Sequence, residues 1–321
     1  MPVSLIHGCC QIETCAADLD AVRAFLVNAL GGVPAEQELA RQISDLIPGN
    51  DYDVDHIDCG QAILQINRPS PAMAWKGSPS VHQRYLEERC PCVTNLNFFV
   101  DDIAHARALL TGMGAATLIE GPSSSARALA DYGPENTRPG GDERPFLFMG
   151  TRDLIGFDLE IMEANFLHFT QQSVQYPAYV QPRPCGNGNG FVMDRLIVDV
   201  PDLDRVLANL TAIFSPGSLS KPYALRQTTL GRSVRAWLGG IEIEYVAPAS
   251  SANLQASPDY GTIDLAFSCD DPALAIRDCE EAGFAVEKCE LDPLGTPCNS
   301  PSWRVASRAV VGFDVILELS S

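Results

Sequence analysis

Apolar and polar residues follow the same order at four places along the chain. The segments "NLNFFVDDIAHARALLTGMGAA" from Asn95 and "DLAFSCDDPALAIRDCEEAGFA" from Asp264 each read as an alternating strand, an Asp-Asp turn, a helical run and a glycine. An Asp at such a turn caps a helix, and a glycine ends it. The same order recurs in "GCCQIETCAADLDAVRAFLVNALGG", with Asp18 at the turn, and in "MDRLIVDVPDLDRVLANLTAIF", with Asp202 at the turn.

Each helix is followed by short strands with turn signals and then by an apolar closing strand. The closing strands are "QAILQINRP", "GFDLEIME", "GGIEIEYVAP" and "GFDVILEL". This repetition predicts four tandem βαβββ units and an α+β fold, in which the units pair into two cupped domains with mixed sheets. The expected units are 4–68, 92–164, 190–248 and 261–320.

A proline- and glycine-rich segment, "QYPAYVQPRPCGNGNG", separates the second unit from the third and predicts the domain boundary. We therefore expect an N-terminal domain over 1–174, a linker over 175–187 and a C-terminal domain over 188–321. Each domain would hold two units.

The charge balance narrows the function. With 22 basic and 41 acidic side chains, the net charge of −19 repels nucleic acid and anionic lipid, so neither is an expected partner. The sequence shows no membrane span and no signal peptide, which indicates a cytoplasmic protein. The 11 cysteines include no CxxC pair and are interpreted as buried, reduced thiols.

The strand, "DLD" turn, helix, glycine and closing "GFDLEIME" strand resemble the vicinal oxygen chelate superfamily. Its members include glyoxalase I, methylmalonyl-CoA epimerase, extradiol dioxygenases and bleomycin-binding proteins. The resemblance covers nearly the whole chain and is specific for the fold, but not for the reaction. It implies that two units curve around one pocket, within one half or across a homodimer.

The resemblance also implies where pocket residues lie, on the first and last strands of each unit. The positions on first strands are seven residues before the turn Asp, and those on closing strands follow a turn. For the N-terminal pocket these positions hold Gln11, Gln65, Asn95 and Glu160. For the C-terminal pocket they hold Arg195, Glu244, Asp264 and Ile316.

Neither set is typical of a metal site, because divalent ions prefer imidazoles and several carboxylates. We expect no cofactor. A weakly held divalent metal on Gln11, Glu160 and His7 is the alternative, since strand alternation places His7 on the side of Gln11. In the other half, Arg195 would repel a dication and predicts a buried ion cluster with Glu244 and Asp264. Anion binding by Arg195 is the alternative there.

Without a metal, Glu160 is the natural base of the N-terminal pocket. Burial on an apolar strand raises the pKa of a carboxyl toward the range useful for moving protons. The amides of Gln11, Gln65 and Asn95 would donate hydrogen bonds to an oxygen that gains charge as an enolate forms. A purely structural Glu160 is the alternative. The predicted substrate-binding residues are His7, His56, Phe98, Phe148 and His168.

These residues favour a small-molecule enzyme that performs acid/base isomerase, epimerase or lyase chemistry on a carbonyl compound. A metal-dependent glyoxalase or an oxygenase similar to extradiol dioxygenases is the second hypothesis. Extradiol dioxygenases need two histidines and one glutamate in one pocket, and the aligned positions of this sequence hold no histidine. A protein that sequesters an aromatic or hydrophobic compound without catalysis is the third.

Overall fold

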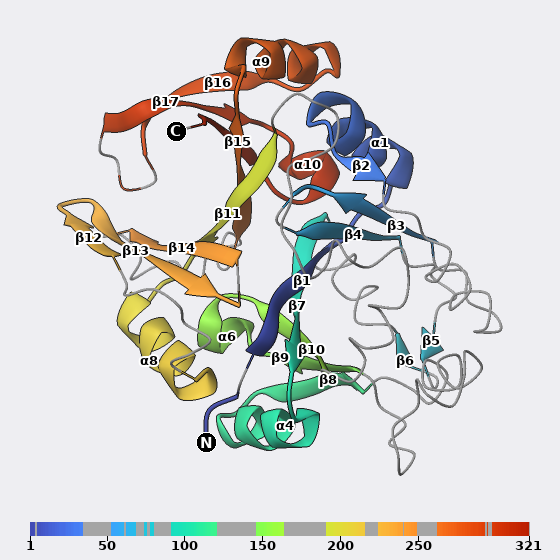
Figure 1. The fold of residues 1–321 in the computed structure, drawn as a ribbon, viewed down its shortest axis with the longest axis vertical. Coiled ribbons are helices and arrows are strands. Elements are labelled where there is room, and N and C mark those ends of the chain that lie inside the picture. The colour runs from blue at the N-terminus through green and yellow to red at the C-terminus, as the bar shows by residue number, and fades with distance from the viewer. Residues whose placement is uncertain are drawn as a thin grey trace.

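Two large β-sheets with flanking helices make up the computed structural model of the chain (Figure 1). No helix in the part of the chain that the structure describes is long and apolar enough to span a membrane. The described residues are 1–3, 5–34, 53–60, 62–68, 74–75, 78–79, 91–120, 146–163, 191–215, 224–239, 241–248, 262–292, 294 and 297–320.

The first sheet is built from two units that share one order of elements. The first unit comprises β1 (Leu5–Cys15), α1 (Leu19–Ala24), the π-helical turn η1 (Phe25–Ala29), β2 (Val33–Pro34), β3 (Asp53–Asp58) and β4 (Ile63–Arg68). The second comprises β7 (Cys92–Val100), α4 (Ile103–Gly112), β8 (Ala116–Glu120), β9 (Phe146–Gly150), α6 (Arg152–Ile155) and β10 (Asp158–Glu163). Between them, β5 (Ala74–Trp75) and β6 (Ser78–Pro79) pair with each other.

The second sheet repeats this construction. Its first unit comprises β11 (Val192–Asp199), α8 (Leu203–Ile213), β12 (Ala224–Thr228), β13 (Gly231–Leu238) and β14 (Ile241–Pro248). Its second unit comprises β15 (Ile263–Cys269), α9 (Pro272–Glu281), β16 (Val286–Leu291), β17 (Pro297–Val305), α10 (Arg308–Val311) and β18 (Val315–Leu319).

Strand order confirms the predicted pairing of units into mixed sheets. The orders are β2-β3-β4-β1-β7-β10-β9-β8 and β12-β13-β14-β11-β15-β18-β17-β16. In each sheet the two first strands pair antiparallel at the centre, as β1 with β7 and β11 with β15. Each first strand also pairs parallel with the closing strand of its own unit. The α+β prediction is therefore confirmed, and both sheets have the same topology.

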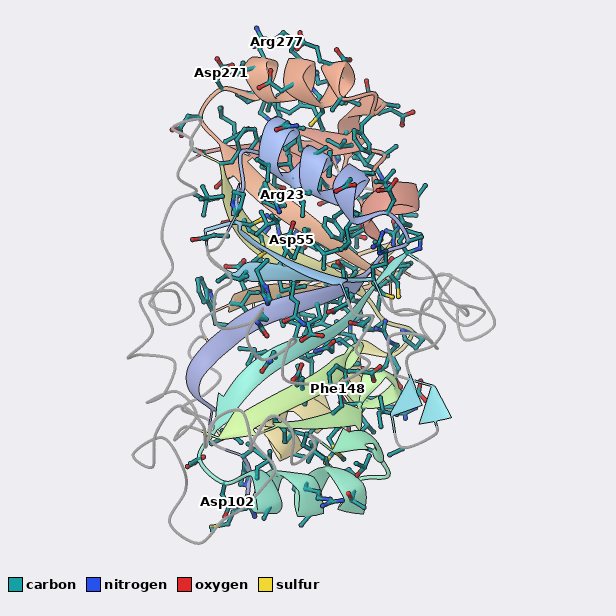
Figure 2. The ribbon with its side chains drawn as sticks, turned by 90° about the vertical axis from the view of Figure 1, so that its right-hand side faces the viewer. Arg23, Asp55, Asp102, Phe148, Asp271 and Arg277 are labelled. Atoms are coloured by element: carbon teal, nitrogen blue, oxygen red, sulfur yellow. The ribbon has the colours of Figure 1, made fainter. Side chains whose placement is uncertain are left out.

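The predicted Asp caps are present at all four helices. Asp18, Asp102, Asp202 and Asp271 each accept a hydrogen bond from the backbone N–H three residues on, at 3.0, 2.8, 3.0 and 3.1 Å. Figure 2 shows Asp102 and Asp271 at the starts of α4 and α9. Such a cap satisfies one backbone donor that a helix leaves unpaired at its N-terminus.

The repeated "GFD" sequences form the same turn in both halves. Each follows a four-residue helix, α6 or α10, which ends at a glycine with positive φ, 89° at Gly156 and 90° at Gly312. Asp158 and Asp314 then reach back and accept from the first backbone N–H of α6 and α10, at 2.8 and 3.0 Å. The sequence pattern did not predict these helices, because four residues carry no detectable period.

The two halves share one apolar core. The rings of Phe25 in η1 and Phe284 after α9 lie 4.2 Å apart between centroids, and Val3 forms a β-bridge with Phe214 after α8. Figure 1 shows α1 beside α10 and α6 beside α8, which are contacting pairs. The first unit thus packs on the fourth, and the second on the third. The predicted linker, 175–187, lies outside the described residues and stays a prediction.

Candidate functional site

The first sheet has an apolar face and a polar face, because side chains alternate along each strand. Ile12, Leu96 and Leu159 belong to the core under the helices, and Asp55 pairs with Arg23 of α1 at 2.6 Å (Figure 2). The neighbouring positions on these strands point the other way. We call this side the polar face; it consists of Gln11, Glu13, His56, Gln65, Asn67, Asn95, Asn97, Phe148 and Glu160.

Strand register joins these residues into one continuous patch. Glu13 of β1 lies between Gln65 of β4 and Asn95 of β7, and His56 of β3 is the next residue beyond Gln65. In the neighbouring row, Glu160 of β10 lies between Asn97 of β7 and Phe148 of β9. All members are buried except Gln65, which is half-buried.

Glu160 is held through its amide neighbour. The side-chain N–H of Asn95 donates to Glu160 Oε2 at 3.2 Å, and the Asn95 oxygen accepts from the Thr94 hydroxyl at 2.7 Å. Glu13, on β1, lies near enough to Glu160 for its charge and hydrogen bonding to raise the pKa of the Glu160 carboxyl. A hydrogen bond between two carboxyls requires a proton on one of them.

A chain of hydrogen bonds leads to Glu13 from the far side of the polar face. His56 Nε2 lies 3.0 Å from Gln65 Oε1, and the Gln65 amide donates to Asn67 Oδ1 at 3.1 Å. The Asn67 amide then donates to Glu13 Oε2 at 3.2 Å. Because Gln65 presents its oxygen to the imidazole, His56 carries its hydrogen on Nε2. All donors in this chain therefore point toward Glu13.

The electrostatics of the patch differ at its two ends. Burial, the charge of Glu13 and the hydrogen bond to Glu13 raise the pKa of Glu160 well above its ordinary value, against the hydrogen bond from Asn95. Burial lowers the pKa of His56, although Gln65 and the nearby carboxylates oppose the shift. The patch thus favours the protonated carboxyl at Glu160 and the neutral imidazole at His56.

Most of the predicted residues come together here. Gln11, Gln65, Asn95 and Glu160 share the polar face with His56 and Phe148. Gln11 accepts from the Asn97 amide at 3.0 Å.

Three predicted residues are not among those that the structure places on the polar face. The side chain of His7 and all of His168 lie outside the described residues. Phe98 requires a correction, because it is fully buried on the apolar face, where its ring centroid lies 6.3 Å from that of Phe214. It follows Asn97 directly, so strand alternation turns it toward the helices and away from the polar face.

Three further residues of the polar face, Glu13, Asn67 and Asn97, were not predicted from the sequence. The resemblance marked one position on each strand, and these residues stand two positions further along. The period of a strand is two, so the alternation by which the sequence predicts His7 on the side of Gln11 predicts Glu13 there as well.

The corresponding face of the second sheet is built differently. At its centre, Ile197, Val246, Ala266 and Leu294 form a small apolar cluster, against which Ile316 packs. Ile316, which occupies the position in β18 that Glu160 occupies in β10, thus serves packing.

The buried ion cluster of the second sheet has a different third member from the predicted one. Arg195 pairs with Glu244 at 3.0 Å and with Glu318 of β18 at 2.6 Å. Asp264 instead pairs with Arg308 and accepts the backbone N–H of Asp314. Glu318 extends from the same face of β18 as Ile316, and it reaches the guanidinium from there.

The four positions taken from the resemblance do not fit a divalent metal. They offer one carboxylate and three amides, and all three amide oxygens already serve protein groups. The Gln11 oxygen accepts from Asn97, the Gln65 oxygen contacts His56, and the Asn95 oxygen accepts from Thr94. In the part of the chain that the structure describes, no three His, Cys, Asp or Glu side chains gather as metal ligands would.

Comparison with known proteins identifies the fold. No family model and no curated protein matches the sequence. A triple mutant of 4-hydroxymandelate synthase from Streptomyces coelicolor matches the structure over 99% of this chain and 93% of its own, with a TM-score of 0.54 and 16% identity. A catechol 2,3-dioxygenase matches over 100% of this chain and 89% of its own, with a TM-score of 0.53 and 11% identity. The Mn(II)-bound glyoxalase from Novosphingobium aromaticivorans matches over 98% and 82%, at 0.53 and 9%.

These likenesses show the fold. The chain has the four-unit, two-sheet fold of the vicinal oxygen chelate proteins, as the sequence predicted. The fold alone does not select among their reactions.

Proposed function

We propose that this protein is an enzyme that transfers a proton on a small carbonyl compound, as an isomerase, epimerase or lyase, at the polar face of the first sheet. The observation that carries the proposal is Glu160, a buried carboxyl with a raised pKa among amide donors. A carboxyl of this kind can hold and exchange a proton near neutral pH, as a general acid/base must.

The neighbouring amides supply the second requirement, stabilisation of the developing oxyanion. Asn95 donates to Glu160, and an amide NH₂ group carries a second hydrogen, so Asn95 can also donate to a substrate oxygen. Gln65 presents its amide on the same face, on the other side of Glu13, and Gln11 lies in the row of Glu160, beyond Asn97. Phe148, directly beside Glu160 in the register, offers an apolar surface for the carbon skeleton.

A metal-dependent reaction is the second candidate. It is supported by the likeness to a glyoxalase described as Mn(II)-bound and to a catechol dioxygenase. It is opposed by the three amide oxygens that already serve as hydrogen-bond acceptors. No step of the proposed reaction uses a metal.

The proposal predicts deuterium exchange in D₂O. Among ketones, β-keto acids and thioesters with an acidic C–H, we expect the purified protein to label at least one compound at the carbon next to the carbonyl. Mass spectrometry or NMR measures the label, and the heat-denatured protein provides the background. If a compound bound tightly and none exchanged, the protein would instead be a binding protein.

A further inference from the structure

Glu13 and Glu160 lie together although their strands are not neighbours. β7 separates β1 from β10, and Asn95 on β7 links the two carboxyls, because it stands opposite Glu13 in the register and donates to Glu160 Oε2. The exposed fractions of the two glutamates are only 2% and 7%. The charge and hydrogen bonding of Glu13 raise the pKa of the Glu160 carboxyl.

We propose that Glu13 and Glu160 share one proton, which Glu160 holds, and that the ionised Glu13 is the base that takes the proton from the substrate carbon. The roles in catalysis rest on the proposed function above. The sharing of the proton does not, because it is a property of the two buried side chains alone.

Repulsion requires the shared proton. Two ionised carboxylates at hydrogen-bond distance in a buried site repel each other strongly, and a single proton between them removes the repulsion. In the part of the chain described by the structure, no salt bridge reaches Glu160 to offset a second charge.

The surroundings decide which carboxyl keeps the proton. The chain from His56 through Gln65 and Asn67 ends as a donor at Glu13 Oε2, and an ionised carboxylate is purely an acceptor. Glu160 accepts one hydrogen bond, from the Asn95 amide, and is otherwise buried away from water. This desolvation favours the neutral form of its carboxyl. Glu160 can then donate its O–H to Glu13.

The two carboxyls together can complete a proton transfer on the substrate without any further reactant. The Glu13 carboxylate takes a proton from the carbon, the C–H electron pair forms the C=C bond of the enolate, and the carbonyl π electrons move to oxygen. Glu160 gives its proton to that oxygen, which leaves Glu13 neutral and Glu160 ionised. Delivery of the Glu13 proton to carbon and return of the enol proton to Glu160 restore the starting state.

Infrared titration of the full-length protein tests the shared proton without a substrate. A neutral carboxyl has a C=O band distinct from that of a carboxylate. ¹³C-glutamate labelling separates this band from Asp158 and Asp264, whose pKa values burial raises to about 7 and about 6. We expect one labelled neutral carboxyl to persist at pH 7 in the wild type. Its absence would overturn the shared proton even if no variant folded.

Three variants assign the band. Glu160→Gln should remove it. Glu13→Gln should move its titration to lower pH, because the charge and the hydrogen bond that raise the pKa of Glu160 are lost. Glu242→Gln, on β14 of the second sheet, is the matched control and should leave the band unchanged. A band that survives Glu160→Gln, or that titrates identically in Glu13→Gln, contradicts the pair.

Exchange into a compound that the wild type labels tests the role of Glu13. We expect Glu13→Gln to slow this exchange by roughly 10²- to 10⁴-fold, as for loss of a general base. If the infrared band behaves as expected and Glu13→Gln still exchanges at the wild-type rate, the pair exists but Glu13 is not the base. If the wild type labels no compound, the proposed function fails while the infrared result stands independently.

Discussion

Replacing Glu160 by glutamine should lower turnover by roughly 10²- to 10⁴-fold and change substrate binding little. Glutamine keeps the size and the oxygen that accepts from Asn95, but it cannot gain or lose a proton. Steady-state kcat and KM on a compound that the wild type converts measure the effect. Glu242→Gln is the control, because this carboxylate lies on the second sheet and pairs with Arg235.

Stability separates this expectation from a structural Glu160. A raised pKa means that the folded state keeps a proton that the unfolded state releases. The folded protein therefore loses stability as the pH rises from 4.5, the ordinary pKa of a glutamate, toward the pKa of Glu160 in the folded state. Glu160→Gln removes this penalty, so its melting temperature at pH 8 should equal or exceed that of the wild type. A lower melting temperature with full activity per folded molecule would show a structural role.

Replacing Gly312 by alanine should destabilise the protein by about 2 to 5 kcal/mol. A Cβ at Gly312 would lie 2.5 Å from the backbone nitrogen of Cys92, at the start of β7, and 2.6 Å from its Cα. The backbone of Cys92 cannot rotate away as a side chain could, so the fourth unit must shift from the second. The positive φ adds about 1 to 2 kcal/mol.

Gly114→Ala is the matched control for this prediction. Gly114 has φ of 95°, close to that of Gly312, but a Cβ there would meet nothing within 4 Å. Gly114→Ala should lower the stability of the fold only by the cost of the positive φ, about 1 to 2 kcal/mol. Denaturant unfolding measures both variants. Equal losses would mean that the contact between Gly312 and Cys92 does not hold the halves together.

The fold could be predicted from sequence because its signals are local. An Asp cap such as Asp102 acts on a backbone N–H three residues away, and Gly283, with φ of 89°, ends its helix by a conformation that few other residues adopt. Four copies of these signals predicted the order of helices and strands. The likeness among the copies predicted that the units pair into two sheets.

The site was only partly predictable because it depends on pairing between distant strands. Glu13 meets Glu160 only through the placement of β1, β7 and β10 side by side. Likewise, Arg195 selects Glu318, 123 residues away, instead of Asp264. The aromatic side chain of Phe98 suggests a substrate contact, but its position in the strand alternation places it on the apolar face.

The central claim is that side chains of the polar face move the proton themselves. Its most direct test compares the deuterium exchange rate of untreated protein, protein stripped of divalent ions by a chelator, and stripped protein reloaded with Mn²⁺. The account predicts the same exchange rate, within a factor of about two, in all three samples. Loss of exchange on stripping with recovery on adding Mn²⁺ would contradict it and establish the metal-dependent reaction.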